Sequence, residues 1–140
     1  MLLKSTSLMD LHYDPATDIL HIDWPELDRV EPGEVDQNFA LIKDVINQYF
    51  IKRFLLDARK TSHLPDTELL REQMIKFFMQ LSGTTLQKVA RLGSSNLQRA
   101  AIAEIVKDVL TSDVTCANQQ TFQFRDFENE DLATKWLLED

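Results

Sequence analysis

The chain is organised around residues 53–62, Arg53-Phe54-Leu55-Leu56-Asp57-Ala58-Arg59-Lys60-Thr61-Ser62. A short apolar run ends there at Asp57 and continues into a charged segment with two hydroxyl side chains. A helix signal follows near Pro65 and Asp66, where Pro65 blocks earlier helical growth and Asp66 can cap the helix. This pattern is typical of a buried strand that delivers polar groups to the rim of a sheet.

Two alternating segments precede this stretch. Apolar and polar residues alternate over Leu8–Tyr13 and again over Ile19–Trp24, and turn-forming residues fill Asp14–Asp18 between them. Alternation with a period of two on both sides of a turn predicts an antiparallel hairpin with one solvated face.

The polar face of this hairpin allows two registers. If Tyr13 pairs with Leu20, His12 lies opposite His21, whereas a slip of two residues places Asp10 opposite His21. In both registers four side chains share one face: Asp10, His12, His21 and Asp23. Such a face can bind a metal or form a pH-sensitive contact patch, but polar residues of this kind also serve a solvated sheet surface. We adopt the solvated surface and assign no metal.

The remaining elements alternate between helix and strand. The expected segments are a helix over 35–50, a helix from 65 or 66 to 81, a strand over 87–92, a helix over 97–110, a strand over 121–125 and a helix after Asp126 or Asn129. Such alternation requires a mainly parallel sheet. The sequence therefore predicts one α/β domain over residues 1–140, with a mixed five-stranded sheet (an N-terminal antiparallel hairpin followed by parallel strands) and four helices.

Composition narrows the class of function. The net charge of −8 argues against binding to nucleic acid or to an anionic membrane surface. The chain has no apolar run of membrane-spanning length and no signal-peptide pattern, so we expect a cytoplasmic protein without a membrane partner. The single Cys116 excludes an intramolecular disulfide. No motif for a cofactor is present, and none is expected.

The hairpin over residues 11–24, the strand Phe54-Leu55-Leu56-Asp57-Ala58-Arg59 and the strand Lys88-Val89-Ala90-Arg91 resemble the STAS/SpoIIAA-like domains. STAS abbreviates sulphate transporter and anti-sigma factor antagonist, and small stand-alone members are common in bacteria. The resemblance covers nearly the whole chain and rests on element order and short apolar patterns. It implies a β/α superhelix and a non-enzymatic switch that binds a kinase or another regulator.

In the family the switch is a phosphorylatable Ser just after the third strand. Asp57 matches the acidic end of that strand, but the following loop lacks the family's Gly and its Asp-Ser step. By position, Ser62 and Thr61 are the candidate phosphoacceptors that the resemblance implies.

The expected topology also favours a binding site at the carboxyl ends of the parallel strands. Ligands of parallel sheets bind beyond the carboxyl ends of the strands, where helix N-termini offer free N–H groups. The loops over 59–63 and 93–96 should be neighbours there. The candidate binding residues are Asp57, Arg59, Lys60, Thr61, Ser62, His63, Ser94, Ser95 and Asn96. The competing interpretation is that residues 94–96 only cap the third helix and that Arg59 pairs with Asp57.

No spacing typical of a catalytic site occurs, since the neighbours Ser62 and His63 do not make a nucleophile–base pair. We therefore expect no enzyme but a protein-interaction module, also able to form a homodimer, that contacts its partner through the second helix and the 57–65 loop. The alternative is a carrier of a small apolar or lipid-like molecule, because the apolar residues between Leu69 and Leu81 exceed one helical stripe.

Overall fold

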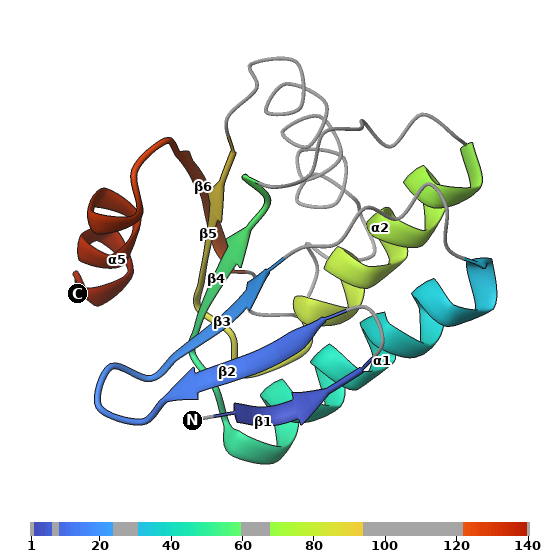
Figure 1. Cartoon of the computed structure of the whole chain (residues 1–140), viewed down its shortest axis with the longest axis horizontal. Coiled ribbons are helices and arrows are strands. Elements are labelled where there is room, and N and C mark those ends of the chain that lie inside the picture. Colours follow the sequence, from blue (N-terminus) through green and yellow to red (C-terminus); the bar gives the residue numbers. More distant parts are fainter. Residues whose placement is uncertain (1, 7–8, 24–30, 60–67, 94–121, 140) are drawn as a thin grey trace.

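A computed structural model describes residues 2–6, 9–23, 31–59, 68–93 and 122–139 of the chain. Six strands form one sheet in sequence order, and the described residues include three helices (Figure 1). The strands are β1 (Leu2–Ser5), β2 (Asp10–Asp14), β3 (Ile19–Asp23), β4 (Arg53–Asp57), β5 (Lys88–Leu92) and β6 (Gln123–Phe127). The helices are α1 (Pro32–Tyr49), α2 (Glu68–Leu81) and α5 (Glu130–Leu138).

The sheet is mixed, as the sequence predicts. β1, β2 and β3 pair in antiparallel fashion, whereas β3, β4, β5 and β6 are parallel. The expected count of five strands is wrong, because β1 adds a sixth strand beside the hairpin. The last strand begins at Gln123, two residues later than expected. The helix expected over 97–110 lies outside the described residues, so the described part of the chain has three helices rather than four.

The hairpin adopts one of the two registers that the sequence allows. Tyr13 pairs with Leu20, and His12 lies opposite His21. Leu11, Leu20 and Ile22 are fully buried, while His12 is exposed. The buried apolar face excludes a slip of one residue, which would turn these side chains to the other face, whereas the choice between the two allowed registers is given by the structure alone.

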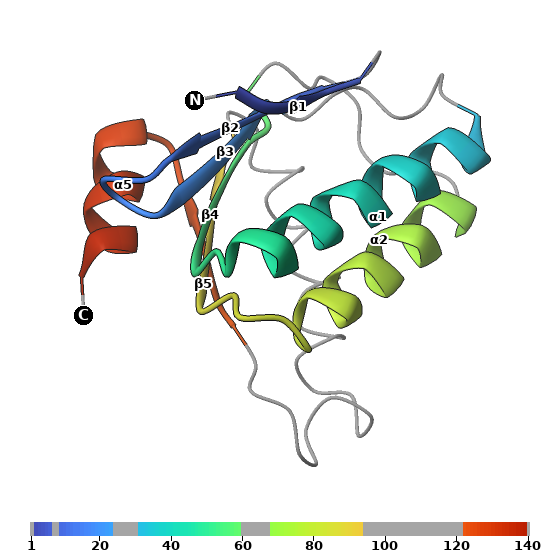
Figure 2. The same ribbon diagram turned by 90° about the horizontal axis from the view of Figure 1, so that it is seen from below.

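Helices cover the two faces of the sheet unequally. Among the described helices, α1 and α2 lie side by side on one face, and α5 lies on the other (Figures 1 and 2). The larger core lies between the sheet and the helix pair. The side chains of Phe39 on α1 and Phe77 on α2 stack there with their ring centroids 4.4 Å apart.

The apolar surplus of α2 is used in this core. Met74, Phe77, Phe78 and Leu81 are buried, and Ile75 and Met79 pack partly buried against them. Phe78 also meets the ring of Phe124 on β6 edge to face. Packing within the chain therefore accounts for the apolar residues from Met74 to Leu81, while Leu69 at the start of the helix is 51% exposed.

The second core joins the opposite face of the sheet to α5. Ala133 and Leu137 of α5 pack on Leu55, Ala90 and Leu92. The end of the helix is fixed by Arg53, whose Nε donates to the Leu137 carbonyl over 2.7 Å, and by Lys88, whose Nζ donates to the Trp136 carbonyl over 2.8 Å.

Helix α5 packs mainly on β4, β5 and β6. On the same face of the sheet, Asp10, His12 and Asp14 of β2 remain exposed. This face is therefore divided into a half covered by α5 and an open polar half, and the boundary runs along β3. Among the described residues, no helix is both long and apolar enough to cross a membrane.

Candidate functional site

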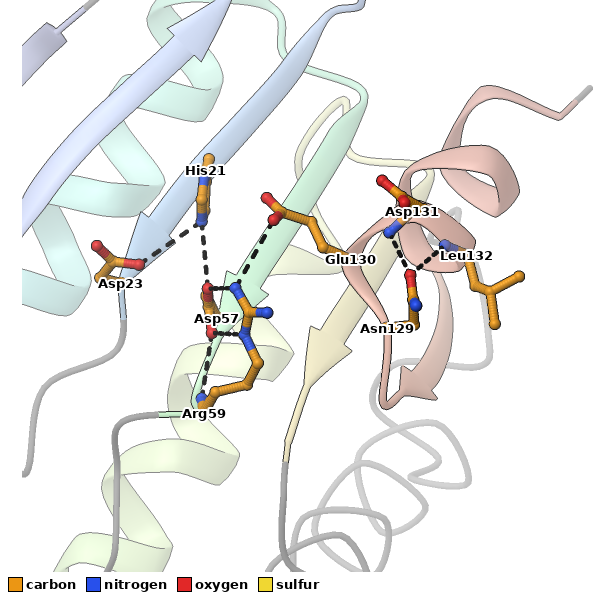
Figure 3. A network of polar contacts seen from close by, with 8 residues as sticks. All are labelled: His21, Asp23, Asp57, Arg59, Asn129, Glu130, Asp131 and Leu132. Atoms are coloured by element: carbon orange, nitrogen blue, oxygen red, sulfur yellow. Dashed lines mark hydrogen bonds and ion pairs between the residues drawn. The ribbon is translucent and has the colours of Figure 1, made fainter.

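The carboxyl ends of β3 and β4 bring polar side chains together at one edge of the sheet. The parallel register pairs Asp23 with Asp57 and His21 with Leu55. Because alternate residues of a strand point to the same face, His21, Asp23 and Asp57 all lie on the side that carries α5. Figure 3 shows the three side chains converging there.

Asp57 is the best-anchored member of this group. Its Oδ1 accepts hydrogen bonds from the backbone N–H of Arg59 (3.1 Å) and from Arg59 Nε (3.0 Å), and its Oδ2 accepts one from Arg59 Nη2 (2.7 Å). The Asp57 side chain is 7% exposed, whereas that of Arg59 is 42% exposed. A buried carboxylate thus holds a guanidinium that still reaches solvent.

This pairing changes the acidity of both groups. Burial would raise the pKa of the Asp57 carboxyl, but the hydrogen bonds and charge of Arg59 outweigh burial, so the pKa lies below its ordinary value. The hydrogen bond to Asp57 in turn raises the pKa of the Arg59 guanidinium. Asp57 is therefore an anion at neutral pH.

His21 lies beside both carboxylates without a hydrogen bond to either. Its Nε2 is 3.6 Å from Asp23 Oδ1 and 3.7 Å from Asp57 Oδ2, distances too long for a hydrogen bond. This nitrogen is buried and, within the described residues, has no hydrogen-bond partner. The three ligand-type atoms lie within 4.8 Å of one another.

The start of α5 adds a further carboxylate. The side chain of Asn129 caps this helix by accepting hydrogen bonds from the backbone N–H groups of Asp131 (2.7 Å) and Leu132 (3.3 Å), which confirms Asn129 as one of the two expected caps. The cap places Glu130 in the first turn, where its Oε2 lies 3.7 Å from Arg59 Nη2 (Figure 3). Arg59 is therefore held between β4 and α5.

The structure describes two of the nine predicted binding residues, Asp57 and Arg59, and these two pair with each other, as the competing interpretation expects. The other seven lie outside the described residues: Lys60, Thr61, Ser62, His63, Ser94, Ser95 and Asn96. The strands that lead into the two loops are adjacent, and the Ala58 N–H donates to the Leu92 carbonyl over 2.8 Å. The carboxyl ends of β4 and β5 therefore lie at the same edge of the sheet.

Asp23 and His21 could not be placed beside Asp57 from the sequence alone, and Glu130 was not among the predicted site residues. The only signal for the first two was their position on the polar face of the hairpin, close to the end of a strand. A parallel pairing of β3 with β4 was needed to join them to Asp57, and no local pattern specifies that pairing.

No protein-family model, curated protein or solved structure matches the chain. The binding chemistry of this edge of the sheet is therefore inferred from the contacts described above. It offers a half-exposed guanidinium with a fixed orientation, which suits an anion, and a group of carboxylates around a ring nitrogen, which suits a cation.

Proposed function

We propose that the protein is a non-enzymatic regulatory module of the STAS-like type, which binds a protein partner at the carboxyl edge of its sheet. The observation that carries this proposal is the Asp57–Arg59 pair. Arg59 is held at both Nε and Nη2 by a buried carboxylate, and its side chain remains 42% exposed.

A guanidinium that is already oriented loses less conformational freedom when a partner binds it. Arg is also among the residues that most often dominate the energy of protein interfaces. Among the described residues, Nη1 of Arg59 makes no hydrogen bond to the rest of the chain, so the fork retains free donors. These features favour a partner that presents a carboxylate or a phosphate.

Regulation by phosphorylation is the finer part of the proposal. The candidate acceptors Thr61 and Ser62 follow Arg59 by two and three residues in the sequence. A phosphate there would add a charge of about −1.5 to −2 and three strong acceptor oxygens. Because Arg pairs with phosphate in a bidentate manner, the added group would compete with the partner for the Arg59 fork.

The test is affinity capture with the immobilised full chain, followed by mass spectrometry. Arg59→Glu should abolish retention of the specific partner, and Lys52→Glu is the matched control. Lys52 is exposed and precedes β4, so it carries the same charge at the opposite end of that strand. The double variant Thr61→Asp, Ser62→Asp should also reduce retention. Capture of the same proteins by wild type and Arg59→Glu, or of none specifically, would refute the proposal.

The proposal includes a homodimer, which light scattering on the purified chain would detect. The alternative, a carrier of an apolar or lipid-like molecule, was motivated by the apolar residues of α2. Met74, Phe77, Phe78 and Leu81 of this helix are buried in the core, so among its described residues Leu69, which is 51% exposed, is the one that supports this alternative. Native mass spectrometry after mild purification would detect a retained ligand.

A further inference from the structure

We propose that His21, Asp23 and Asp57 form a binding site for one divalent transition-metal cation of the Zn²⁺ or Mn²⁺ class. This inference departs from the solvated-surface interpretation of the hairpin. It joins two residues of that surface to a carboxylate from β4. It goes beyond the proposed function, because it concerns the isolated chain and requires no partner.

The spacing of the three atoms carries the first part of the argument. A tetrahedral site with metal–ligand distances of about 2.1 Å has ligand atoms about 3.4 Å apart. His21 Nε2 lies 3.6 Å from Asp23 Oδ1 and 3.7 Å from Asp57 Oδ2. The two carboxylate oxygens lie within 4.8 Å of each other, so a cation placed among the three atoms would draw the two carboxylates towards it.

The second part concerns His21 Nε2 itself. Buried polar atoms of folded proteins almost always have a hydrogen-bond partner, and one without a partner calls for an explanation. This nitrogen is buried, and within the described residues it has no such partner, although two carboxylate oxygens face it. A metal ion between the nitrogen and these oxygens would use the lone pair of a neutral imidazole.

Arg59 supports the site rather than competing for it. Its Nη2 takes one position on Asp57 Oδ2, and a carboxylate oxygen has two acceptor positions. The same oxygen lies 3.7 Å from His21 Nε2, so its second acceptor position is left for a cation beside that nitrogen. Ligating carboxylates are commonly held by such hydrogen bonds from outside the site, which fix their orientation. Arg59 is thus a positioning residue for the Asp57 ligand.

Charge and donor type select the cation. Asp23, Asp57 and Glu130 bring three negative charges against the single positive charge of Arg59, so the neighbourhood carries an excess of two negative charges when His21 is neutral. Mg²⁺ and Ca²⁺ prefer oxygen ligands alone, whereas an imidazole combined with carboxylates suits Zn²⁺ and Mn²⁺. Water would complete the coordination, because only three protein ligands are present.

The experiment is calorimetric titration of the full chain, first freed of metal with a chelator, with zinc chloride, manganese chloride and magnesium chloride. We expect one Zn²⁺ or Mn²⁺ per chain and much weaker binding of Mg²⁺. Removing one ligand in Asp23→Asn or His21→Gln should weaken the affinity by a factor of about ten or more. His12→Gln is the matched control, because His12 is exposed opposite His21 on the neighbouring strand, outside the ligand group.

A second measurement identifies which histidine binds the cation, in addition to how tightly the cation binds. In long-range proton–nitrogen spectra of the three His rings, the cation should shift the His21 signals and leave the His12 signals in place. Asp23 is 57% exposed, so Asp23→Asn should fold even if His21→Gln does not. The proposal is overturned if no stoichiometric binding occurs, if Asp23→Asn binds as tightly as wild type, or if the His21 ring does not respond. Because no partner protein enters this experiment, failure of the proposed function would leave its outcome unaffected.

Discussion

Replacing Asp57 by Asn tests the anchor of the candidate site. The carboxylate accepts three hydrogen bonds, all from Arg59. A hydrogen bond to a charged group contributes about 1.5–3 kcal/mol, but pairs with exposed partners contribute only about 0–1 kcal/mol, and Arg59 is 42% exposed. The Asn oxygen can keep the bond from the Arg59 backbone. We therefore expect Asp57→Asn to lower the free energy of unfolding by about 2 kcal/mol at neutral pH.

This loss should depend on pH in a defined direction. The pKa of Asp57 in the folded chain lies below its ordinary value, because the bonds from Arg59 outweigh burial. Unfolded Asp has a pKa of about 3.9. A carboxyl with a lowered pKa in the folded state contributes stability that is complete above the unfolded value and is lost as the pH falls through the folded value. The cost of Asp57→Asn should therefore shrink below about pH 4.

Urea unfolding followed by tryptophan fluorescence, in the presence of a chelator and between about pH 7 and pH 2.5, measures this dependence. Asp44→Asn is the control, because Asp44 is an exposed residue of α1 and the substitution removes the same charge. Two results would refute the reasoning. One is a cost of Asp57→Asn below about 0.5 kcal/mol at neutral pH. The other is a cost that grows as the pH falls, since burial would then dominate over the bonds from Arg59.

Three further predictions concern the fold. The hydroxyl of Tyr13 donates to Asp18 over 2.7 Å, and this bond raises the pKa of Tyr13 to about 12. In urea titrations, Tyr13→Phe should therefore lower the free energy of unfolding by about 1–2 kcal/mol near pH 8. The loss should become smaller as the pH rises from the unfolded pKa of about 10 towards 12, and a loss that stays constant over this range would contradict the prediction. Arg91 is 3% exposed and donates to Asp126 over 2.9 Å. In the same assay, Asp126→Asn should lower the free energy of unfolding by about 3 kcal/mol. The double variant Asp126→Asn, Arg91→Met should be more stable than this single variant, because no buried charge is then left unpaired. Equal stability of the two would argue against the prediction. Phe50 ends α1 with a φ of 53° and is 68% exposed. Phe50→Gly should raise stability by about 0.5–1 kcal/mol, and an unchanged thermal midpoint would exclude strain there.

The sequence predicted those elements whose burial is periodic. Matching two apolar faces limited the hairpin to two registers, and both place Leu20 and Ile22 on the core face, where the structure buries them. The strand from Arg53 to Asp57 was predicted with its observed bounds, since an apolar run closed by a carboxylate is distinctive. Such signals are strong because one slipped residue would bury a polar side chain.

The sequence pattern did not predict strand β1. Its four residues are exposed or half-buried, so they carry no alternation between a core face and a solvent face. The strand pairs with the outer edge of β2, and pairing of that kind leaves little trace in the sequence. The same limit applies to the candidate site. Asp23 and Asp57 are far apart in the chain, and only the parallel register makes them neighbours.

The position of His21 on β3 explains how a buried ring nitrogen that has no hydrogen-bond partner among the described residues can occur there. Its ring lies on β3, between the half of the sheet that α5 covers and the open half that carries His12. On the open half a ring nitrogen would be solvated, and under the helix it would be enclosed by the apolar side chains around Leu55 and Ala133. At the boundary Nε2 is buried while the side chain as a whole is 35% exposed. A site built there is dry enough to strengthen electrostatic contacts and open enough for a ligand to enter, which neither half of the sheet offers alone.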